Sequence, residues 1–107
     1  MYIRIIKVIN NDGSIELFFK NLGHWDYLEL IKNLLVNENQ CFVINELDMI
    51  TDKDILLDYQ GFHFLLRHHY MLGNYLQTTE TNQIIILEQL ANNVANSINE
   101  YIKKQRN

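Results

Sequence analysis

Hydrophobic and polar positions change their spacing along the first half of the chain, and each spacing predicts a different element. Residues 2–9 are rich in β-branched side chains, and residues 15–19 alternate apolar and polar positions. The turn-forming sequence 10–14 between them predicts a β-hairpin. Over residues 25–36, apolar side chains recur at intervals of three and four, which predicts a helix. Residues 41–47 return to β-branched and aromatic side chains and predict a third strand.

Alternation resumes in residues 54–59 and predicts a strand register with the segment that follows. Gln60 and Gly61 are taken as the central residues of a two-residue turn, so the flanking strands pair directly. The inward-facing pairs are then apolar and the outward-facing pairs join opposite charges, as cross-strand pairing favours. The expected pairs are Tyr59 with Phe62, Leu57 with Phe64, Ile55 with Leu66, Asp58 with His63 and Asp54 with Arg67.

A second two-residue turn is predicted at Gly73-Asn74, which adds one more strand to this meander. The turn places Leu72 opposite Tyr75, Tyr70 opposite Gln77 and Arg67 opposite Glu80, so that Arg67 would lie between two carboxylates. It also leaves several neighbouring apolar side chains on the sheet face that points away from the core. These are Leu56, Leu65, Met71 and Leu76.

The last segment returns to helical spacing. Apolar residues from Ile84 to Ile102 fall at intervals of three and four, and Thr81 or Asn82 is the candidate N-cap. The predicted order is therefore β-β-α-β-β-β-β-α. This order indicates an α+β fold in which an antiparallel sheet of about six strands has two helices packed on one face. No linker or repeat interrupts the sequence, so residues 1–107 are predicted to form a single domain.

Composition agrees with a folded domain, because 48% of the 107 residues are hydrophobic and 21% are charged. No apolar run approaches the length of a membrane span, and the N-terminal run has internal charges and no cleavage site, so neither a membrane segment nor a signal peptide is expected. The single cysteine, Cys41, lies among apolar residues, cannot form an internal disulfide and indicates a reducing compartment. We expect a cytoplasmic protein.

Negative charge is concentrated in one short segment, whose sum of −4 equals the net charge of the whole chain. Two of its acids have expected cross-strand partners, so the three before them would remain as unpaired loop charge. Such a surface repels nucleic acid and favours a cationic protein partner, whereas loop carboxylates are also often simply solvated. The acids are Glu46, Asp48, Asp52, Asp54 and Asp58, and the only base among them is Lys53.

Candidate catalytic and metal-binding patterns are weak. His63 and His69 would share one strand face but lie about 20 Å apart at the usual strand rise, and no cysteine pair or second ligand accompanies them, so no metal or cofactor is expected. An acid–base pair of Asp58 and His63, with Tyr59 or Tyr70, is the best hydrolase arrangement, but it has no nucleophile nearby. The sequence therefore favours a protein that is not an enzyme.

The sequence Asp54-Ile-Leu-Leu-Asp-Tyr-Gln-Gly-Phe, followed by His68-His69, Gly73-Asn74 and a closing amphipathic helix, resembles small immunity proteins of bacterial contact-dependent growth inhibition systems. The resemblance covers the C-terminal half of the chain. It implies a cytoplasmic protein that binds one cognate protein toxin and blocks its active site.

Combined with the acidic segment, this resemblance leads to the hypothesis of an inhibitor that neutralises a basic toxin such as a nuclease. The alternative is a small housekeeping or ligand-binding domain that forms a homodimer through the outer sheet face. The candidate partner-binding residues are Glu46, Asp48, Asp52, Asp54, Asp58, Leu65 and Met71.

Overall fold

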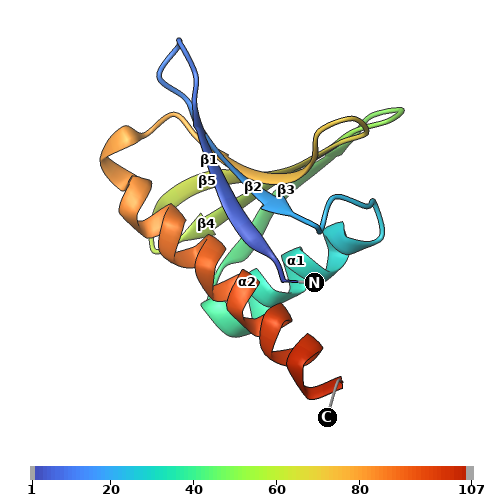
Figure 1. Cartoon of the computed structure of the whole chain (residues 1–107). Coiled ribbons are helices and arrows are strands. Elements are labelled where there is room, and N and C mark those ends of the chain that lie inside the picture. Colours follow the sequence, from blue (N-terminus) through green and yellow to red (C-terminus); the bar gives the residue numbers. More distant parts are fainter. Residues whose placement is uncertain (1, 106–107) are drawn as a thin grey trace.

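The computed structural model describes residues 2–105 and confirms the predicted order of elements (Figure 1). A short 3₁₀ turn, η1 (Thr81–Gln83), precedes the last helix. The main elements are β1 (Arg4–Ile9), β2 (Ile15–Lys20), α1 (Tyr27–Asn39), β3 (Phe42–Asp48), β4 (Lys53–Tyr59), β5 (Phe62–His69), β6 (Gly73–Thr78) and α2 (Ile84–Gln105).

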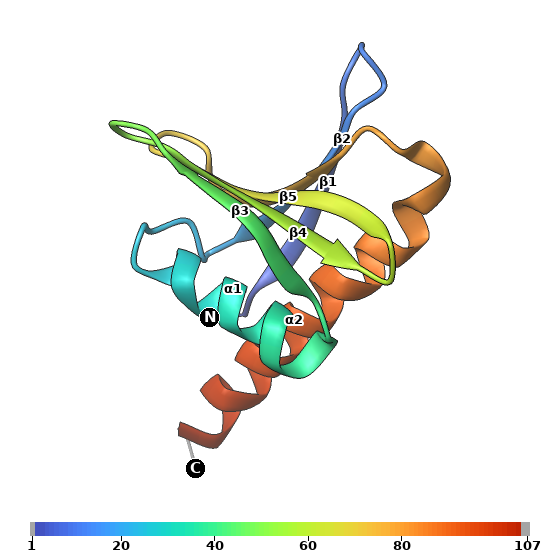
Figure 2. The ribbon, with the colours of Figure 1, turned by 180° about the vertical axis from the view of Figure 1, so that it is seen from behind.

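The six strands form one antiparallel sheet in the order β1-β2-β6-β5-β4-β3. Both helices lie on the same face of this sheet, and no element formed by residues 2–105 covers the opposite face (Figures 1 and 2). We call the covered face the inner face and the uncovered face the outer face. The predicted α+β fold, with two helices on one side of an antiparallel sheet, is therefore confirmed.

A single hydrophobic core lies between the inner face and the helices. Helix α2 contributes side chains at the predicted spacing, among them Leu87, Val94 and Ile98. Cys41 is also buried at this core, as expected from its apolar neighbours. Burial raises the pKa of the Cys41 thiol to about 11, so the thiol is protonated at neutral pH.

Helix α1 begins two residues later than predicted and extends three residues further. Its core-facing residues are Leu28, Ile31 and Leu35, and it ends where Gln40 adopts a left-handed conformation with φ of 60°. Trp25 was expected in this helix but lies before it, where its ring meets the ring of His68 edge-on at 4.9 Å. Helical spacing suggested a core position for Trp25, but Trp25 instead contacts the ring of His68.

The residue before β1 is held by the last helix rather than by a neighbouring strand. Asn99 of α2 accepts a hydrogen bond from the Ile3 backbone N–H at 2.7 Å and donates one to the Ile3 carbonyl at 3.0 Å. One amide side chain thus satisfies both backbone groups of a residue that has no strand partner on that side.

The register predicted between β4 and β5 is confirmed at every expected pair. Gln60 and Gly61 both have positive φ, of 51° and 89°, as the favoured two-residue hairpin turn requires. Leu57 and Phe64 therefore point into the core, whereas Asp58 and His63 point outward.

The register predicted between β5 and β6 is wrong. Tyr70 to Leu72 form the connection, and Gly73 already belongs to β6, so Arg67 pairs with Tyr75 rather than with Glu80. Leu76 pairs with Leu66 and is fully buried in the core, not on the outer face. The difference is an odd number of positions, which exchanges the two faces of β6.

Contacts with a distant loop explain the observed register. The side chain of Asn74 donates hydrogen bonds to the carbonyls of Leu22 at 2.7 Å and His24 at 3.0 Å, which requires it to point inward. Beside it, Gly73 has φ of 87°, and a Cβ built there would lie 2.9 Å from the Cα of Gly23. The start of β6, next to the β5–β6 connection, therefore packs closely against residues 22–24.

We predict that Gly73→Ala destabilises the protein more than Gly13→Ala does. Both glycines have φ near +88°, but the added methyl group meets nothing within 4 Å at Gly13 and the Gly23 backbone at Gly73. Steric overlap of this kind costs about 1–3 kcal/mol beyond the conformational strain common to both. Urea unfolding monitored by circular dichroism measures the difference. Equal losses for the two variants would contradict the close packing of Gly73 on Gly23.

Candidate functional site

The outer face is the candidate functional site because no helix or strand of the described part of the chain covers it. The sheet is bent, and the β1–β2 turn and the β3–β4 turn rise at two of its corners (Figures 1 and 2). The side chain of Tyr75 points to this face but is only 4% exposed, as expected near the floor of a curved surface. Two central rows of cross-strand neighbours are Asp54, Arg67, Tyr75, Phe18 and Ile6, and Leu56, Leu65, Gln77, Glu16 and Val8.

A continuous hydrogen-bond network crosses four strands of the outer face. Arg67 donates from Nε to Asp54 Oδ1 at 2.8 Å and from Nη1 to Gln77 Oε1 at 2.7 Å. Gln77 Nε2 donates to Glu16 Oε2 at 3.3 Å, and Asn10 Nδ2 donates to Glu16 Oε1 at 3.0 Å. The network satisfies these polar groups and fixes the long Arg67 side chain in one position.

Aromatic rings form the floor beneath this network. The rings of Phe18 and Tyr75 stack with centroids 4.6 Å apart, and the Arg67 guanidinium carbon lies 5.9 Å from the Tyr75 centroid. Burial raises the pKa of the Tyr75 hydroxyl above its ordinary value, while Arg67 opposes the shift and the nearby carboxylate of Glu16 adds to it. Tyr75 is therefore an uncharged, rigid part of the surface at neutral pH.

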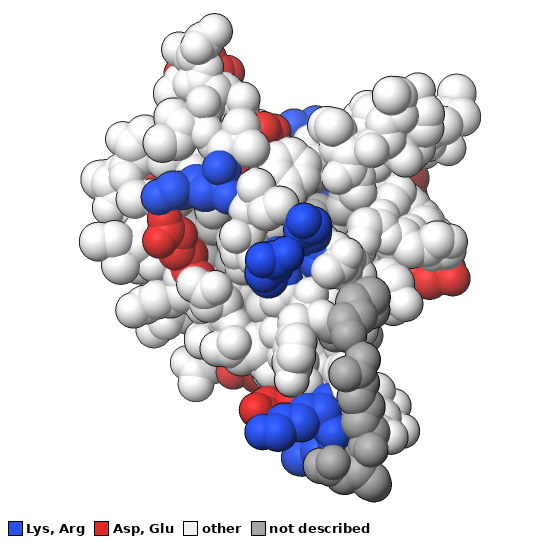
Figure 3. Space-filling model, in the orientation of Figure 1, with Lys and Arg blue, Asp and Glu red and all other residues white. Residues whose placement is uncertain are grey.

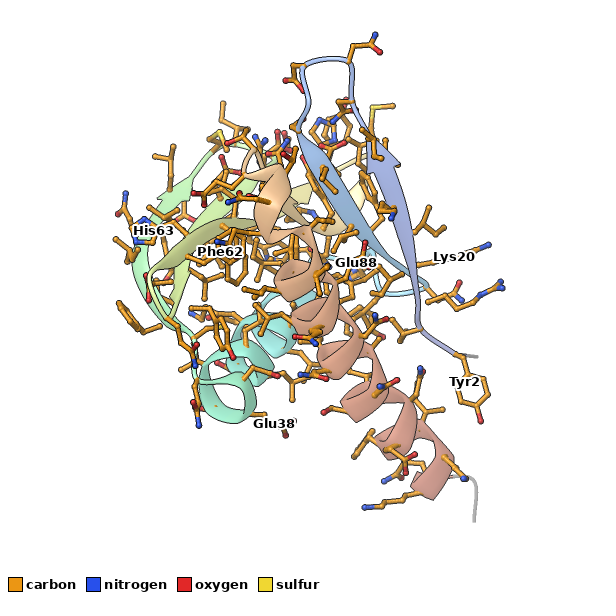
Figure 4. All side chains as sticks on the ribbon, turned by 90° about the vertical axis from the view of Figure 1, so that its left-hand side faces the viewer. Tyr2, Lys20, Glu38, Phe62, His63 and Glu88 are labelled. Carbon is orange, nitrogen blue, oxygen red and sulfur yellow. The ribbon has the colours of Figure 1, made fainter. Side chains whose placement is uncertain are left out.

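Asp58 and His63 form the expected cross-strand pair, at the end of β4 and the start of β5. Asp58 Oδ1 lies 3.0 Å from His63 Nε2, and Asp58 Oδ2 accepts the Gly61 backbone N–H at 3.2 Å. The Asp58 carboxylate is nearly buried, whereas His63 is exposed on the side away from the core that its neighbour Phe62 enters (Figure 4). Tyr59 follows Asp58 in the strand and faces inward, so it does not join this pair.

The expectation that Glu46 and Asp48 provide unpaired loop charge is wrong. Both belong to β3, where the register places them on the inner face. Glu46 lies 3.0 Å from Lys53 and 3.5 Å from Lys32 of α1, and Asp48 lies 3.3 Å from Lys53. The hydrogen bond from Lys53 lowers the pKa of Glu46, against the effect of burial, so the carboxylate stays charged and paired.

The other acids of this segment face outward. Asp54 is paired with Arg67, and Asp52 in the β3–β4 turn accepts the Tyr70 backbone N–H at 3.2 Å and lies 3.9 Å from His69 Nε2. Met71, on the neighbouring β5–β6 connection, is 72% exposed. The structure thus groups Asp54, Asp58 and Leu65 on the outer face, with Asp52 and Met71 at one corner.

Several residues of the outer face were not predicted. Tyr75 and Gln77 reach it from β6, and the odd-numbered shift in the β6 register explains why the sequence did not indicate them. They meet Glu16 and Phe18 of β2 on this face. Exposed apolar side chains line the margins of the face at Ile6, Val8, Phe42 and Leu47.

The two serine hydroxyls of the chain are both bonded to carboxylates. The Ser14 hydroxyl donates to Asp12 at 2.7 Å, and the Ser97 hydroxyl donates to Glu38 at 2.7 Å. Among residues 2–105, no three His, Cys, Asp or Glu side chains are grouped as metal ligands would be. Within the same residues, neither helix combines the length and apolar character needed to cross a bilayer.

Comparisons with known proteins add no family to these observations. No protein-family model, characterised protein or solved structure matches the chain. The resemblance to immunity proteins stays a prediction, and the outer face is interpreted from its own geometry.

We predict that Glu46→Gln lowers the free energy of unfolding at pH 7 by about 1 kcal/mol, because it removes the charge that pairs with Lys53 and Lys32. Glu100→Gln, an exposed position on α2, is the control and should change stability little. The pKa of Glu46 is lowered from 4.5 by folding, so its contribution is complete above pH 4.5 and is lost as the pH falls through the folded-state value.

Urea titrations at pH 7 and at about pH 3 measure this dependence. The difference between Glu46→Gln and the unmodified protein should shrink at the lower pH. A difference that is independent of pH would show that the variant acts through packing rather than charge.

Proposed function

We propose that this chain is a non-enzymatic protein-binding domain of the immunity type, which docks a protein toxin on its outer face and thereby covers the active site of that toxin. The single observation that supports this proposal most strongly is the uncovered, bent sheet face, with a polar network at its centre and exposed apolar side chains at its margins. Interfaces between proteins usually have an apolar centre and a polar rim, so the distribution on this face is the reverse. The uncovered area and the presence of both kinds of side chain are what support docking.

The outer face is already ordered in the free chain. Arg67 is held by Asp54 and Gln77, and no buried side-chain nitrogen or oxygen among the described residues lacks a hydrogen-bond partner. A partner that covers this face therefore needs to immobilise few side chains, which reduces the entropic cost of association. Leu56 and Leu65, half-buried beside the network, offer apolar contacts at its centre.

Charge supports a basic partner, but only in part through the residues that the sequence indicated. Arg67 balances Asp54, whereas Glu16 is bonded to neutral amides and Asp58 to a histidine. Arg4 and Lys20 face outward only at the far end of the β1–β2 hairpin, so the end near the β1–β2 turn stays negative. A negative surface of this kind favours and orients a cationic protein such as a nuclease toxin.

The same charge distribution disfavours nucleic acid as a direct ligand. On the side of the molecule that Figure 3 shows, lysine and arginine side chains occur in separate small groups and not in a continuous stripe. Among the described residues, Lys7 is paired with Glu88, and Lys53 is paired with Glu46 and Asp48. A nucleic-acid-binding surface instead requires a continuous stripe of basic side chains.

Self-association is the alternative use of the outer face. Two copies would bring their apolar margins, including Phe42 and Leu47, together around a symmetry axis. They would also bring two copies of the same negative surface together, which opposes close contact. We therefore favour a foreign partner.

Leu65→Lys and Met71→Lys test the docking surface. The expected result is that a protein captured by the unmodified chain in its native cells is lost with both variants, because a charge at a desolvated contact is costly. Leu30→Lys is the matched control, since Leu30 is partly exposed on α1, away from the outer face. Affinity capture with mass spectrometry measures retention, and circular dichroism checks folding.

The captured protein must also be inhibited by the purified chain at a one-to-one ratio, as an immunity protein requires. Light scattering of the chain alone reports its oligomeric state. A dimer that Leu65→Lys converts to a monomer would support self-association instead. A captured protein that both variants retain would place the contact elsewhere on the molecule.

A further inference from the structure

A hollow of about 460 Å³ lies at one end of the outer face, between the β1–β2 turn and the start of β5. We call it the β6-end hollow, because the chain leaves the sheet there after Thr78. Strand β6 pairs with β5 only from Leu65 to His69, so residues 62–64 of β5 have no β6 neighbour. The gap left by the missing strand residues forms the hollow.

The lining of the hollow combines carboxylates with an apolar floor. Asp12 from the β1–β2 turn and Glu80 from the segment after β6 contribute the carboxylates, and Leu56 and Leu65 contribute apolar surface. No lysine or arginine is among its lining residues within the described part of the chain. The exposed residues of the lining therefore include two carboxylates, and its half-buried residues include two leucines beside neutral polar groups.

Two further carboxylates lie directly behind the lining. Glu16 is bonded to the lining residue Gln77, and Asp58 is bonded to the lining residue His63. Neither has a lysine or arginine partner among residues 2–105. Hydrogen bonds from the Ser14 hydroxyl and backbone N–H lower the pKa of Asp12, so the carboxylate at the rim remains charged at neutral pH.

We propose that the β6-end hollow receives a lysine or arginine side chain of the protein partner. Such a side chain has a long aliphatic stem and a cationic head, which match the Leu56 and Leu65 floor and the Asp12 and Glu80 rim respectively. This inference rests on the proposed function and specifies it, because it defines the anchor by which a basic protein is recognised. It also sets the orientation of the partner on the outer face, with the anchoring side chain near the β1–β2 turn.

The test uses the intact free chain and a small probe, N-acetyl-L-arginine amide, followed by two-dimensional NMR of the backbone amides. The expected result is saturable shifts centred on Ser14, Gly61 and Thr79, which border the hollow. N-acetyl-L-citrulline amide has nearly the same shape without the charge and should bind more weakly. Raising the salt concentration should weaken binding of the arginine probe, because exposed charges are screened.

Asp12→Asn combined with Glu80→Gln is expected to weaken binding of the arginine probe by about threefold or more, which corresponds to the loss of two partly screened charge contacts. Asp26→Asn combined with Glu100→Gln is the matched control, because it removes the same charges from positions outside the hollow and should leave affinity unchanged. The dispersion of the NMR spectrum confirms that both double variants are folded.

Equal binding of the citrulline probe, shifts scattered over the surface, or equal affinity in the two double variants would overturn the proposal. These outcomes are separate from the partner-capture experiment, because they require no partner. If the chain captures a toxin but does not bind the arginine probe, the proposed docking surface is supported and the proposed anchor is contradicted. Loss of capture in Asp12→Asn with Glu80→Gln, but not in the control, would further support the anchor.

Discussion

The inward hydrogen bonding of Asn74 is the constraint on which the arrangement of the outer face depends. Its Nδ2 donates to two backbone carbonyls, of Leu22 and His24, so its Oδ1 must accept from His68 Nδ1 at 2.8 Å. This sets the tautomer of His68 and fixes the register of β6 on β5. Because β6 lies between β2 and β5 in the sheet, the same register determines which side chains of β2 meet Arg67 and its neighbours.

The two faces of the sheet differ in how their side chains are stabilised. The inner face is apolar and is closed by α1 and α2, whereas the outer face distributes its polar groups into one network and leaves apolar groups at the margins. The half-buried guanidinium of Arg67 needs acceptors in fixed positions, and Asp54 and Gln77 provide them from neighbouring strands. The side chains of the bent outer face can therefore stay ordered without a covering layer.

Local sequence was sufficient to predict the strand register at the β4–β5 turn. The β4–β5 register was predictable because the Gln60-Gly61 turn and the alternation on both sides agree with each other. The β5–β6 register was not predictable, since the partners of Asn74 and Gly73 lie about fifty positions earlier in the chain, in a loop whose location only the fold determines.

The prediction that the first acids of residues 46–58 are unpaired was wrong for the same reason. Glu46 is neutralised by Lys32 of α1, a contact that depends on how the helix crosses the sheet. Asp54 and Asp58, by contrast, have partners within one hairpin and were paired correctly. Contacts within a hairpin can be inferred from spacing, whereas contacts between layers require the packing itself.

The hold of Asn99 on Ile3 has a consequence for how sheets of neighbouring molecules can join. By occupying both backbone groups of Ile3, the helix side chain blocks the site where an incoming chain would begin to align with the start of β1. Lateral growth of the sheet from that border would first have to break the helix contact. The opposite border, along β3, carries a bulge between Val43 and Asn45 that interrupts regular pairing. Both borders thus discourage edge-to-edge pairing between the sheets of two molecules.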